Sequence, residues 1–384
     1  MKAAAFVLFL AFLPRFPAAA ATDVPAEHTA VLREMTAQDR VLVVAPHPDD
    51  ESLGAGGLLQ RAVAAHSKIR VVFLTNGENN AWAQGFIEHR FYIGASDKAR
   101  WGARRQKEAL HALDTLGVPA KAALFLGFPD CGTTLLLMRN SQAFRTAVDS
   151  SIVAWRPTIL VLPSPDDLHP DHSTAWVITH LEYRGLNVPL PLELDYLVHT
   201  NGNPYEPERV ELALTPREKQ IQLEAILCHA TQMALGRKRW TAYARDVETF
   251  EPQPLPRELA PRHPICEVQL LPGTLHMTLC LPITGGMNGA MIDVAMQSQG
   301  GGAIRLQFPA PPVSRSVPVT DTITRQPVAT AAVQALADKI VINLPVDSPM
   351  RQVFVKFDHA PIFFDTAGWR QAPVSISSSP VDFY

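Results

Sequence analysis

The chain has 384 residues, of which 47% are hydrophobic and 18% are charged, and its formal net charge is −3. This length and composition are typical of a globular protein with a large core and about two domains. The small net charge and the lack of a basic run argue against a nucleic-acid-binding protein, so we expect no nucleic-acid partner.

The first 21 residues have the pattern of a secretory signal peptide. Lys2 precedes an apolar run from Ala3 to Leu13, and small residues end the segment at Ala21. The apolar run is too short to span a bilayer, so we expect no transmembrane anchor. We therefore predict an exported protein, periplasmic or secreted. A buried first helix is the alternative.

The first predicted domain comprises residues 22–250, and from about residue 40 to 200 it alternates short apolar runs with helical patterns. The runs are rich in β-branched residues and lack polar alternation, as in strands buried on both faces of a parallel sheet. They are RVLVVAP at 40–46, IRVVFLT at 69–75, AALFLGF at 122–128 and PTILVLP at 157–163. Helical patterns lie between them, for example at 53–67 and 103–117. We predict a Rossmann-like, doubly wound, mainly parallel α/β sheet.

A proline-rich segment ends this first domain. Residues 251–264, EPQPLPRELAPRHP, contain five prolines and predict a linker. Residues 265–384 show short alternating runs separated by turn residues, which predict a smaller all-β, sandwich-like domain. Cys266 and Cys280 could form a disulfide between neighbouring strands of an exported protein. Two buried thiols are an equally good interpretation, because pairing cannot be deduced from sequence.

Two clusters of histidine and aspartate follow the first and the fourth of the predicted strands. They are APHPDDE at 45–51 and SPDDLHPDH at 164–172. Sites in open α/β sheets form beyond the carboxyl ends of the strands, so these clusters can converge. His47, Asp50 and His172 would then provide two imidazoles and a carboxylate, a set suited to Zn²⁺ or Fe²⁺. Each motif alone also fits a solvated turn followed by helix-capping acids.

The two motifs resemble the signatures of the LmbE/PIG-L family of metal-dependent de-N-acetylases, which includes N-acetylglucosaminyl deacetylases. The first signature matches at 46–51 and the second at 167–172. The supporting matches are Arg105 and Glu108 in RQKEA, the segment LGFPDCG, and residues 219–232. The resemblance covers roughly residues 40–250 and leaves the C-terminal region outside it.

The resemblance implies roles for the residues of both motifs. His47, Asp50 and His172 would be the ligands of Zn²⁺, or of Fe²⁺ or another divalent ion. Asp49 would be the general base that takes a proton from the attacking water. His169 would stabilise the charge that develops on the carbonyl oxygen. Either His169 or Asp49 would protonate the leaving amine.

The resemblance also implies supporting residues around these. Asp171 would hydrogen-bond a histidine ring and fix its tautomer, although it could be a simple turn aspartate. Arg105 would hold a sugar hydroxyl or help to stabilise the oxyanion, unless it lies on a solvated helix face. His229 and Gln232, three residues apart on one helix face, would line the site or pack in the core. Glu51 is better explained as an acid that favours a helix N-terminus.

We therefore expect an exported, zinc-dependent hydrolase that removes the acetyl group from an N-acetylglucosamine-type amino sugar in an oligo- or polysaccharide. A thiol conjugate, a glycolipid or an antibiotic precursor is the alternative amide substrate. A non-haem iron oxygenase could use the same ligands, but such ligand sets commonly lie in a β-barrel. A metal-binding or sugar-binding protein without activity would not need Asp49.

Two regions have no assigned role at this point. The aromatic-rich insertion at 79–101 could stack on sugar rings or pack on its own small cluster. The C-terminal β-domain could bind glycan, form a wall of the cleft or be a structural appendage.

Overall fold

The computed structural model describes residues 29–183, 189–200, 209–253, 263–283, 286–347, 349–359 and 364–373. The predicted signal peptide and residues 254–262 of the predicted linker lie outside these described residues. Among the helices within them, none combines the length and the hydropathy needed to cross a membrane.

The first domain is built on a mixed, mainly parallel sheet. Its strands in the described residues are β1 (Thr29–Val31), β2 (Arg40–Ala45), β3 (Lys68–Thr75), β4 (Ala123–Phe128), β5 (Ile159–Pro163), β6 (Leu192–Tyr196), β7 (Arg209–Ala213) and β8 (Val247–Gln253). They lie in the order β1-β7-β8-β6-β5-β2-β3-β4. All neighbours are parallel except the two pairs that β8 makes with β6 and β7. The predicted α/β sheet is confirmed, and β8 includes the first three residues of the predicted linker.

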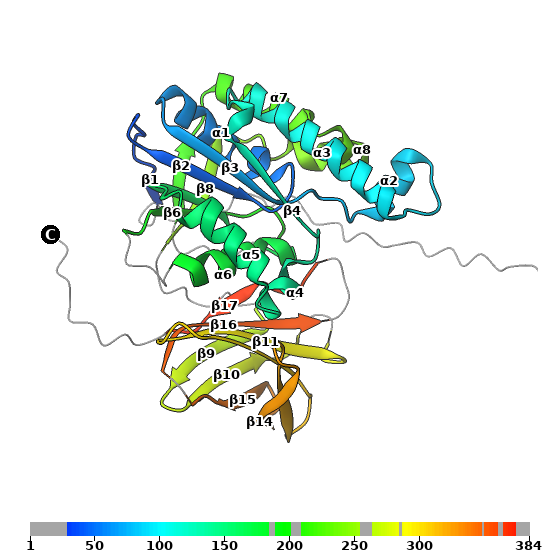
Figure 1. The fold of residues 1–384 in the computed structure, drawn as a ribbon, viewed down its shortest axis with the longest axis vertical. Coiled ribbons are helices and arrows are strands. Elements are labelled where there is room, and N and C mark those ends of the chain that lie inside the picture. The colour runs from blue at the N-terminus through cyan, green and yellow to red at the C-terminus, as the bar shows by residue number, and fades with distance from the viewer. Residues whose placement is uncertain are drawn as a thin grey trace, which may run out of the picture.

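Helices cover both faces of this sheet (Figure 1). On one face α1 (Asp50–Ala64), α3 (Ala95–Thr115) and α7 (Pro216–Leu227) pack against Val41 and Val43 of β2. On the other face α4 (Thr133–Met138), α5 (Gln142–Val148) and α6 (Pro170–Tyr183) pack against Leu42 and Val44. Successive strand residues point to opposite faces, which explains why β2 is apolar throughout. The remaining helical segments are α2 (Ala81–Glu88), η2 (Ala120–Ala122), η3 (Asp149–Val153) and α8 (Ala230–Thr241).

The order of the sheet reverses between β2 and β5. From β2 the chain passes through α1 to β3 and through α3 to β4, whereas β5 and β6 lie on the other side of β2. The loops that follow β2 and β5 therefore diverge from neighbouring parallel strands. In open α/β sheets the ligand site forms at this place.

α1 begins directly after the first of these loops and lies close to its neighbours. A Cβ atom on Gly54 would stand 2.3 Å from Tyr196 Cδ2, and one on Gly57 would stand 2.4 Å from Leu214 Cδ2. Larger residues would therefore push α1 away from the sheet. The glycines of LGAGG keep the first turn of α1, and with it Asp50, against the end of β6.

The β-domain, residues 263–373 where described, contains one antiparallel sheet (Figure 1). Its strands are β9 (Ile265–Leu271), β10 (Thr274–Cys280), β11 (Ala290–Ser298), β12 (Ala303–Pro309), β13 (Arg315–Asp321), β14 (Gln326–Ala335), β15 (Lys339–Pro345), β16 (Met350–His359) and β17 (Trp369–Gln371). Their order is β17-β16-β11-β12-β13-β14-β15-β10-β9, and β9 contacts both β16 and β17. The sheet therefore curls, like a barrel, around a single core. The predicted all-β domain is confirmed, with one curled sheet in place of two stacked ones.

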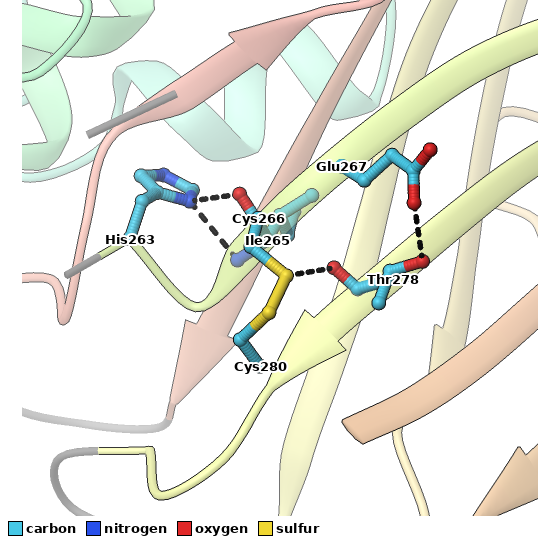
Figure 2. Close-up of a disulfide and its surroundings, with 6 residues drawn as sticks. All are labelled: His263, Ile265, Cys266, Glu267, Thr278 and Cys280. Carbon is cyan, nitrogen blue, oxygen red and sulfur yellow. Dashed lines mark hydrogen bonds between the residues drawn. A yellow bond between two sulfur atoms is a disulfide. The ribbon is translucent and has the colours of Figure 1, made fainter. Parts of the chain in front are cut away.

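A disulfide joins Cys266 on β9 to Cys280 on β10, with their Cα atoms 5.8 Å apart (Figure 2). His263 lies next to it, and its Nδ1 accepts a hydrogen bond from the backbone N–H of Ile265 at 3.0 Å. Of the two interpretations that the sequence allowed, the structure has the disulfide. The free cysteines of the described residues are Cys131 and Cys228.

The two domains share a core. Ala295, Phe354 and Trp369 of the β-domain are buried in the same apolar cluster as side chains of α4, α5 and α6. Arg305 of the β-domain is 2% exposed, and its Nε donates to Leu137 O at the end of α4, at 3.1 Å. The β-domain is thus packed against the helices that follow β4 and β5.

Candidate metal centre

Three side chains from two loops meet where the sheet order reverses. His47 follows β2, Asp50 begins α1, and His172 lies in the first turn of α6. His47 Nδ1 is 3.2 Å from His172 Nε2 and 3.3 Å from Asp50 Oδ2, and the last two atoms are 3.1 Å apart. All three residues are buried. The structure therefore brings the three predicted ligands together as a nearly equilateral triangle of donor atoms.

This triangle fits a divalent cation. Donors in a tetrahedral site with bonds of about 2.0–2.1 Å are about 3.3 Å apart, close to the spacing found here. The other ring nitrogens of His47 and His172 face carboxylates, so a proton on each of them leaves a lone pair at the triangle. Two lone pairs and a carboxylate oxygen at this spacing repel one another unless positive charge lies among them.

Three further carboxylates orient the two histidines. His47 Nε2 lies 3.2 Å from Asp130 Oδ1 and 3.3 Å from Asp171 Oδ2. His172 Nδ1 lies 3.1 Å from Asp167 Oδ2. Asp171 thus contacts a histidine ring, whereas Asp130 and Asp167 are candidates that sequence analysis did not assign. The available signal for Asp130 was its place after β4, at the same edge of the sheet.

These carboxylates are themselves held by backbone N–H groups. Asp171 Oδ2 accepts from Cys131 N at 2.7 Å, and Asp171 Oδ1 accepts from Thr133 N at 3.1 Å and Thr133 Oγ1 at 2.6 Å. Asp167 accepts from the backbone N–H groups of His169, Val198 and His199 at 2.9–3.0 Å. The loop after β4 and the segment after β6 therefore fix the orientation of His47 and His172.

Asp49 lies directly before Asp50 and has a strained backbone, with φ 148° and ψ −27°. Its N–H donates to Glu51 Oε2 at 3.0 Å, and its Oδ2 is 3.1 Å from Arg105 Nη2. Arg105 also donates to Gly77 O and Pro48 O, both at 2.8 Å. Arg105 is thus buried and holds the loop that carries Asp49. Its predicted contact with substrate stays a prediction.

His229 reaches the same loop from the other side. Its Nε2 is 3.1 Å from Glu51 Oε1, which also accepts from Ser52 Oγ at 2.8 Å. Glu51 is in the first turn of α1, and both Glu51 and His229 are buried. Glu51 thus connects His229 to the backbone of Asp49. The predicted contacts of His229 and Gln232 with substrate stay predictions.

His169 lies beside the triangle. Its ring meets the ring of His47 edge-on at 4.4 Å between centroids, and the nitrogens of His47, His169 and His172 lie within 4.8 Å of one another. Asp171 N donates to His169 Nδ1 at 3.2 Å, which leaves the ring proton on Nε2. His199, which sequence analysis did not assign, lies with its Nδ1 3.1 Å from Asp167 Oδ1.

Burial and charge shift the ionisation of these groups. Burial raises the pKa of Asp49 to about 6, although Arg105 opposes the shift. Burial lowers the pKa of His169 well below its ordinary value, and the neighbouring histidines lower it further. Burial also lowers the pKa of His172, but Asp167 and Asp50 more than offset this and raise it to about 9. The acids around His172 thus favour positive charge at this place, which a cation bound at the triangle would supply, whereas His169 stays neutral.

The aromatic-rich insertion, residues 79–101, forms α2, the turn after it and the start of α3. Trp82 and Phe86 stack at 6.0 Å between centroids on an exposed side of α2. The loop before α2 reaches the centre, since Asn79 N donates to Asp130 Oδ2 at 2.8 Å. The large apolar side chains exposed on this insertion are Trp82, Phe86, Phe91 and Tyr92.

Together these groups could activate a water molecule and stabilise an oxyanion. The triangle offers two nitrogens and one oxygen to a cation. The buried carboxylate of Asp49 precedes the ligand Asp50, and the neutral imidazole of His169 lies beside the triangle. A positioned base and a positioned hydrogen-bond donor around a metal ion are the parts that hydrolysis of an amide requires.

Comparison with known proteins agrees with the motifs. Residues 42–180 match the family model described as "PIG-L: GlcNAc-PI de-N-acetylase". The 1D-myo-inositol 2-acetamido-2-deoxy-alpha-D-glucopyranoside deacetylase of Corynebacterium diphtheriae is 29% identical over 166 residues, 39% of this chain and 54% of that protein. The protein of the same name from Rhodococcus opacus is 34% identical over 150 residues, 35% and 50% of the two chains. The chain thus spans about half the length of these curated relatives.

A solved structure is also similar. The N,N'-diacetylchitobiose deacetylase from Pyrococcus horikoshii has a TM-score of 0.43 and 21% sequence identity. The similarity covers 56% of this chain and 84% of that chain.

Proposed function

We propose that the chain is a metal-dependent hydrolase which removes the N-acetyl group of an N-acetylglucosamine-type amino sugar. Residues 42–180, which match the PIG-L family model, support this proposal. The observation that carries the proposal is the triangle of His47, Asp50 and His172 with Asp49 beside it. A site that only bound a metal would have no need of a buried carboxylate at this position.

His47, Asp50 and His172 would hold Zn²⁺, with Fe²⁺ or another divalent ion as the alternative, because two imidazoles and one carboxylate leave coordination positions open. A bound divalent ion would lower the pKa of a coordinated water and polarise the amide carbonyl. Asp130, Asp171 and Asp167 keep the two imidazoles in the tautomers that such a site requires.

Asp49 acts as the general base. It is held by Arg105 and by the hydrogen bond from its N–H to Glu51, so its carboxylate is fixed before substrate arrives. It accepts the proton of the attacking water as the new C–O bond forms, and burial brings its pKa towards the neutral range in which a base works well. Asp49 can then return this proton to the leaving amine.

His169 stabilises the oxyanion. Because Asp171 N donates to its Nδ1, the ring carries its proton on Nε2 and can donate it in a hydrogen bond. The neutral state follows from burial, which lowers the pKa of His169. A neutral donor stabilises the oxyanion without adding charge to a centre that already holds a cation.

The proposed substrate comes from the names of the relatives, and the proposed compartment comes from the sequence and the disulfide. The family description names GlcNAc-PI, and the curated relatives are named for an acetamido sugar joined to inositol. An N-acetylglucosamine unit is common to both, so we propose it here, with a thiol conjugate, a glycolipid or an antibiotic precursor as alternatives. The signal-like residues 1–21 and the disulfide support export, because disulfides persist in oxidising compartments.

The test is acetate release from N-acetylglucosamine and its oligomers by purified protein with measured zinc content. We expect release that disappears with a chelator and returns with Zn²⁺. In Asp49→Asn the rate should fall about 10²–10⁴-fold with the metal still bound, whereas Asp114→Asn, exposed on α3, should keep the rate. Zinc-loaded wild-type protein that releases no acetate from these sugars would contradict the proposed substrate.

A further inference from the structure

We propose that Phe364, supplied by the β-domain, is a substrate-contacting residue that selects for a pyranose ring. The proposal rests on the proposed function and extends it to a domain outside the family match, residues 42–180. It follows from the place of the segment 364–370 against the loop that carries His169 and His172.

The backbone of this segment is hydrogen-bonded to the loop after β5. Asp365 N donates to Leu168 O at 2.8 Å, and Trp369 N donates to Pro165 O at 3.0 Å. A Cβ atom on Gly368 would stand only 1.7 Å from Pro165 O, so no other residue fits there without movement. The segment and the loop therefore lie in direct backbone contact.

Charged groups fix the same contact. Arg370 Nη1 is 2.7 Å from Asp166 Oδ1, and Asp365 Oδ2 is 2.5 Å from the buried Lys356 Nζ. His263 Nε2 donates to Gly368 O at 3.2 Å from the other side. These contacts join the segment to the first domain and to the rest of the β-domain, so they fix the position of the Phe364 side chain.

Phe364 lies beside the two histidines next to the metal ligands. Its ring is 5.9 Å from the ring of His169 at an interplanar angle of 81°, and 5.2 Å from the ring of His199 at 39°. His199 in turn meets the ligand His172 at 4.8 Å. Phe364 is partly exposed, whereas His169 and His172 are buried. Phe364 therefore lies on the solvent side of His169, next to the buried ligands.

An aromatic ring at that place matches an amino sugar. When the acetamido group lies at the metal centre, the pyranose ring must extend outwards from it. The C–H face of a pyranose is apolar, and burial of such a face on an aromatic ring is favourable. His169, next to Phe364, would contact the polar acetamido group of the same sugar.

The experiment compares Phe364→Ala, Phe364→Trp and the control Val328→Ala, which truncates an exposed apolar side chain of the β-domain. For hydrolysis of N-acetylglucosamine and its oligomers we expect Phe364→Ala to raise KM about 10-fold with kcat within about 2-fold. Metal content and melting temperature should match those of Val328→Ala, and Phe364→Trp should restore KM. A fall in kcat and metal content at unchanged KM would show a purely structural role and overturn the proposal.

A binding measurement separates this proposal from the proposed function. In the Asp49→Asn background, calorimetric titration with N-acetylglucosamine oligomers should show about 10-fold weaker binding when Phe364→Ala is added. This result together with no acetate release by the wild type would leave the role of Phe364 intact and contradict the deacetylase. Equal binding with and without Phe364→Ala, or no binding of these sugars at all, would overturn the role of Phe364.

Discussion

The side chains that shape this centre are mostly not the ones that would touch a metal ion. His47 has the correct nitrogen at the triangle because Asp130 and Asp171 bind the other one, and His172 depends on Asp167 in the same way. Each of these contacts fixes which ring nitrogen carries the proton. The geometry of the centre is thus determined by the residues that contact the ligands.

Arg105 and its neighbour Arg104 allow a matched test of the residues that support the centre. Arg105→Gln removes the partner of Asp49 and one of the groups that hold Pro48, so Asp49 should lose its fixed position. We expect kcat to fall about 10–100-fold with little change in KM, because the interaction supports the transition state more than substrate binding. Steady-state kinetics with acetate detection measures both constants.

Arg104 is the neighbouring residue on α3 but is half exposed and pairs with Glu108. Arg104→Gln should therefore keep wild-type kinetics. A rise in KM at constant kcat in Arg105→Gln would instead support the sequence prediction that Arg105 binds the sugar directly.

The sequence predicted the individual ligands better than their supporting residues. His47, Asp50 and His172 are in short motifs next to strand ends, so local pattern was enough to select them. Asp130 and His199 come from other loops, and their function depends on distances that only the folded chain defines. Arg105 was selected by its spacing from Glu108, but that pattern contains no information on whether the side chain points to the loop or to the substrate.

At the level of elements, the strands of the first domain could be predicted because both of their faces are buried. Continuous apolar runs correspond to β2, β3, β4 and β5. The antiparallel strand β8 was missed, because EPQ at 251–253 has the polar, proline-containing composition of a linker and its pairing with β6 is a long-range contact. The curl of the β-domain was likewise not predictable, since alternating strands give the same pattern in a sandwich and a barrel.

The disulfide should contribute strongly to the stability of the β-domain. It closes a loop of 14 residues between β9 and β10, for which chain entropy predicts a loss of about 3 kcal/mol of unfolding free energy when the bridge is removed. The double variant Cys266→Ser/Cys280→Ser should show this loss in urea unfolding, whereas Cys228→Ser, a free thiol, should show a much smaller one. Four reactive thiols in the folded wild-type protein would contradict the bridge.

His263 makes the contact between β9 and the segment 364–370 sensitive to pH. Burial, together with the nearby charge of Arg370, lowers its pKa from 6.5 to about 3. The unfolded chain therefore binds a proton at higher pH than the folded chain, so stability is full above about pH 6.5 and falls as the pH drops towards 3. At pH 5 the expected loss is about 2 kcal/mol relative to neutral pH.

Urea unfolding of His263→Gln at pH 7.5 and pH 5 tests this expectation. The glutamine can still donate to Gly368 O but has no imidazole to protonate, so the variant should lose about 2 kcal/mol less than the wild type between the two pH values. His111→Gln, exposed on α3, should keep the pH dependence of the wild type. An identical pH dependence in His263→Gln and the wild type would exclude His263 as the source.

For the whole molecule, the important finding is that the β-domain supports two segments around the metal centre, namely α4 and the loop after β5. Arg305 binds Leu137 O, and Thr322 Oγ1 donates to Met138 O, at the end of α4. The start of α4 is Thr133, which holds Asp171. The segment 364–370 contacts the loop after β5 directly. From the sequence, the β-domain could be a glycan-binding module, a wall of the cleft or an appendage, because no local pattern shows which surface one domain presents to another.

Arg370→Gln tests whether the contact between the β-domain and the loop after β5 affects the affinity of the centre for zinc. Arg370 is 3% exposed and binds Asp166, which directly precedes the aspartate that holds His172. Without the ion pair, the loop after β5 should sample more orientations, and zinc affinity should fall about 10-fold, as expected for loss of an outer contact of a metal site. Competition with a chromogenic chelator measures the affinity in the full-length protein.

The control is Arg315→Gln, an exposed arginine of β13 in the same domain. It should leave zinc affinity unchanged. Removal of a nearly buried arginine also costs stability, by about 1–3 kcal/mol, so the affinity must be compared under conditions in which both variants are folded. If Arg370→Gln is less stable but binds zinc as tightly as Arg315→Gln, the β-domain stabilises the fold without tuning the metal centre. A selective loss of affinity would mean that the centre is complete only when both domains are in place.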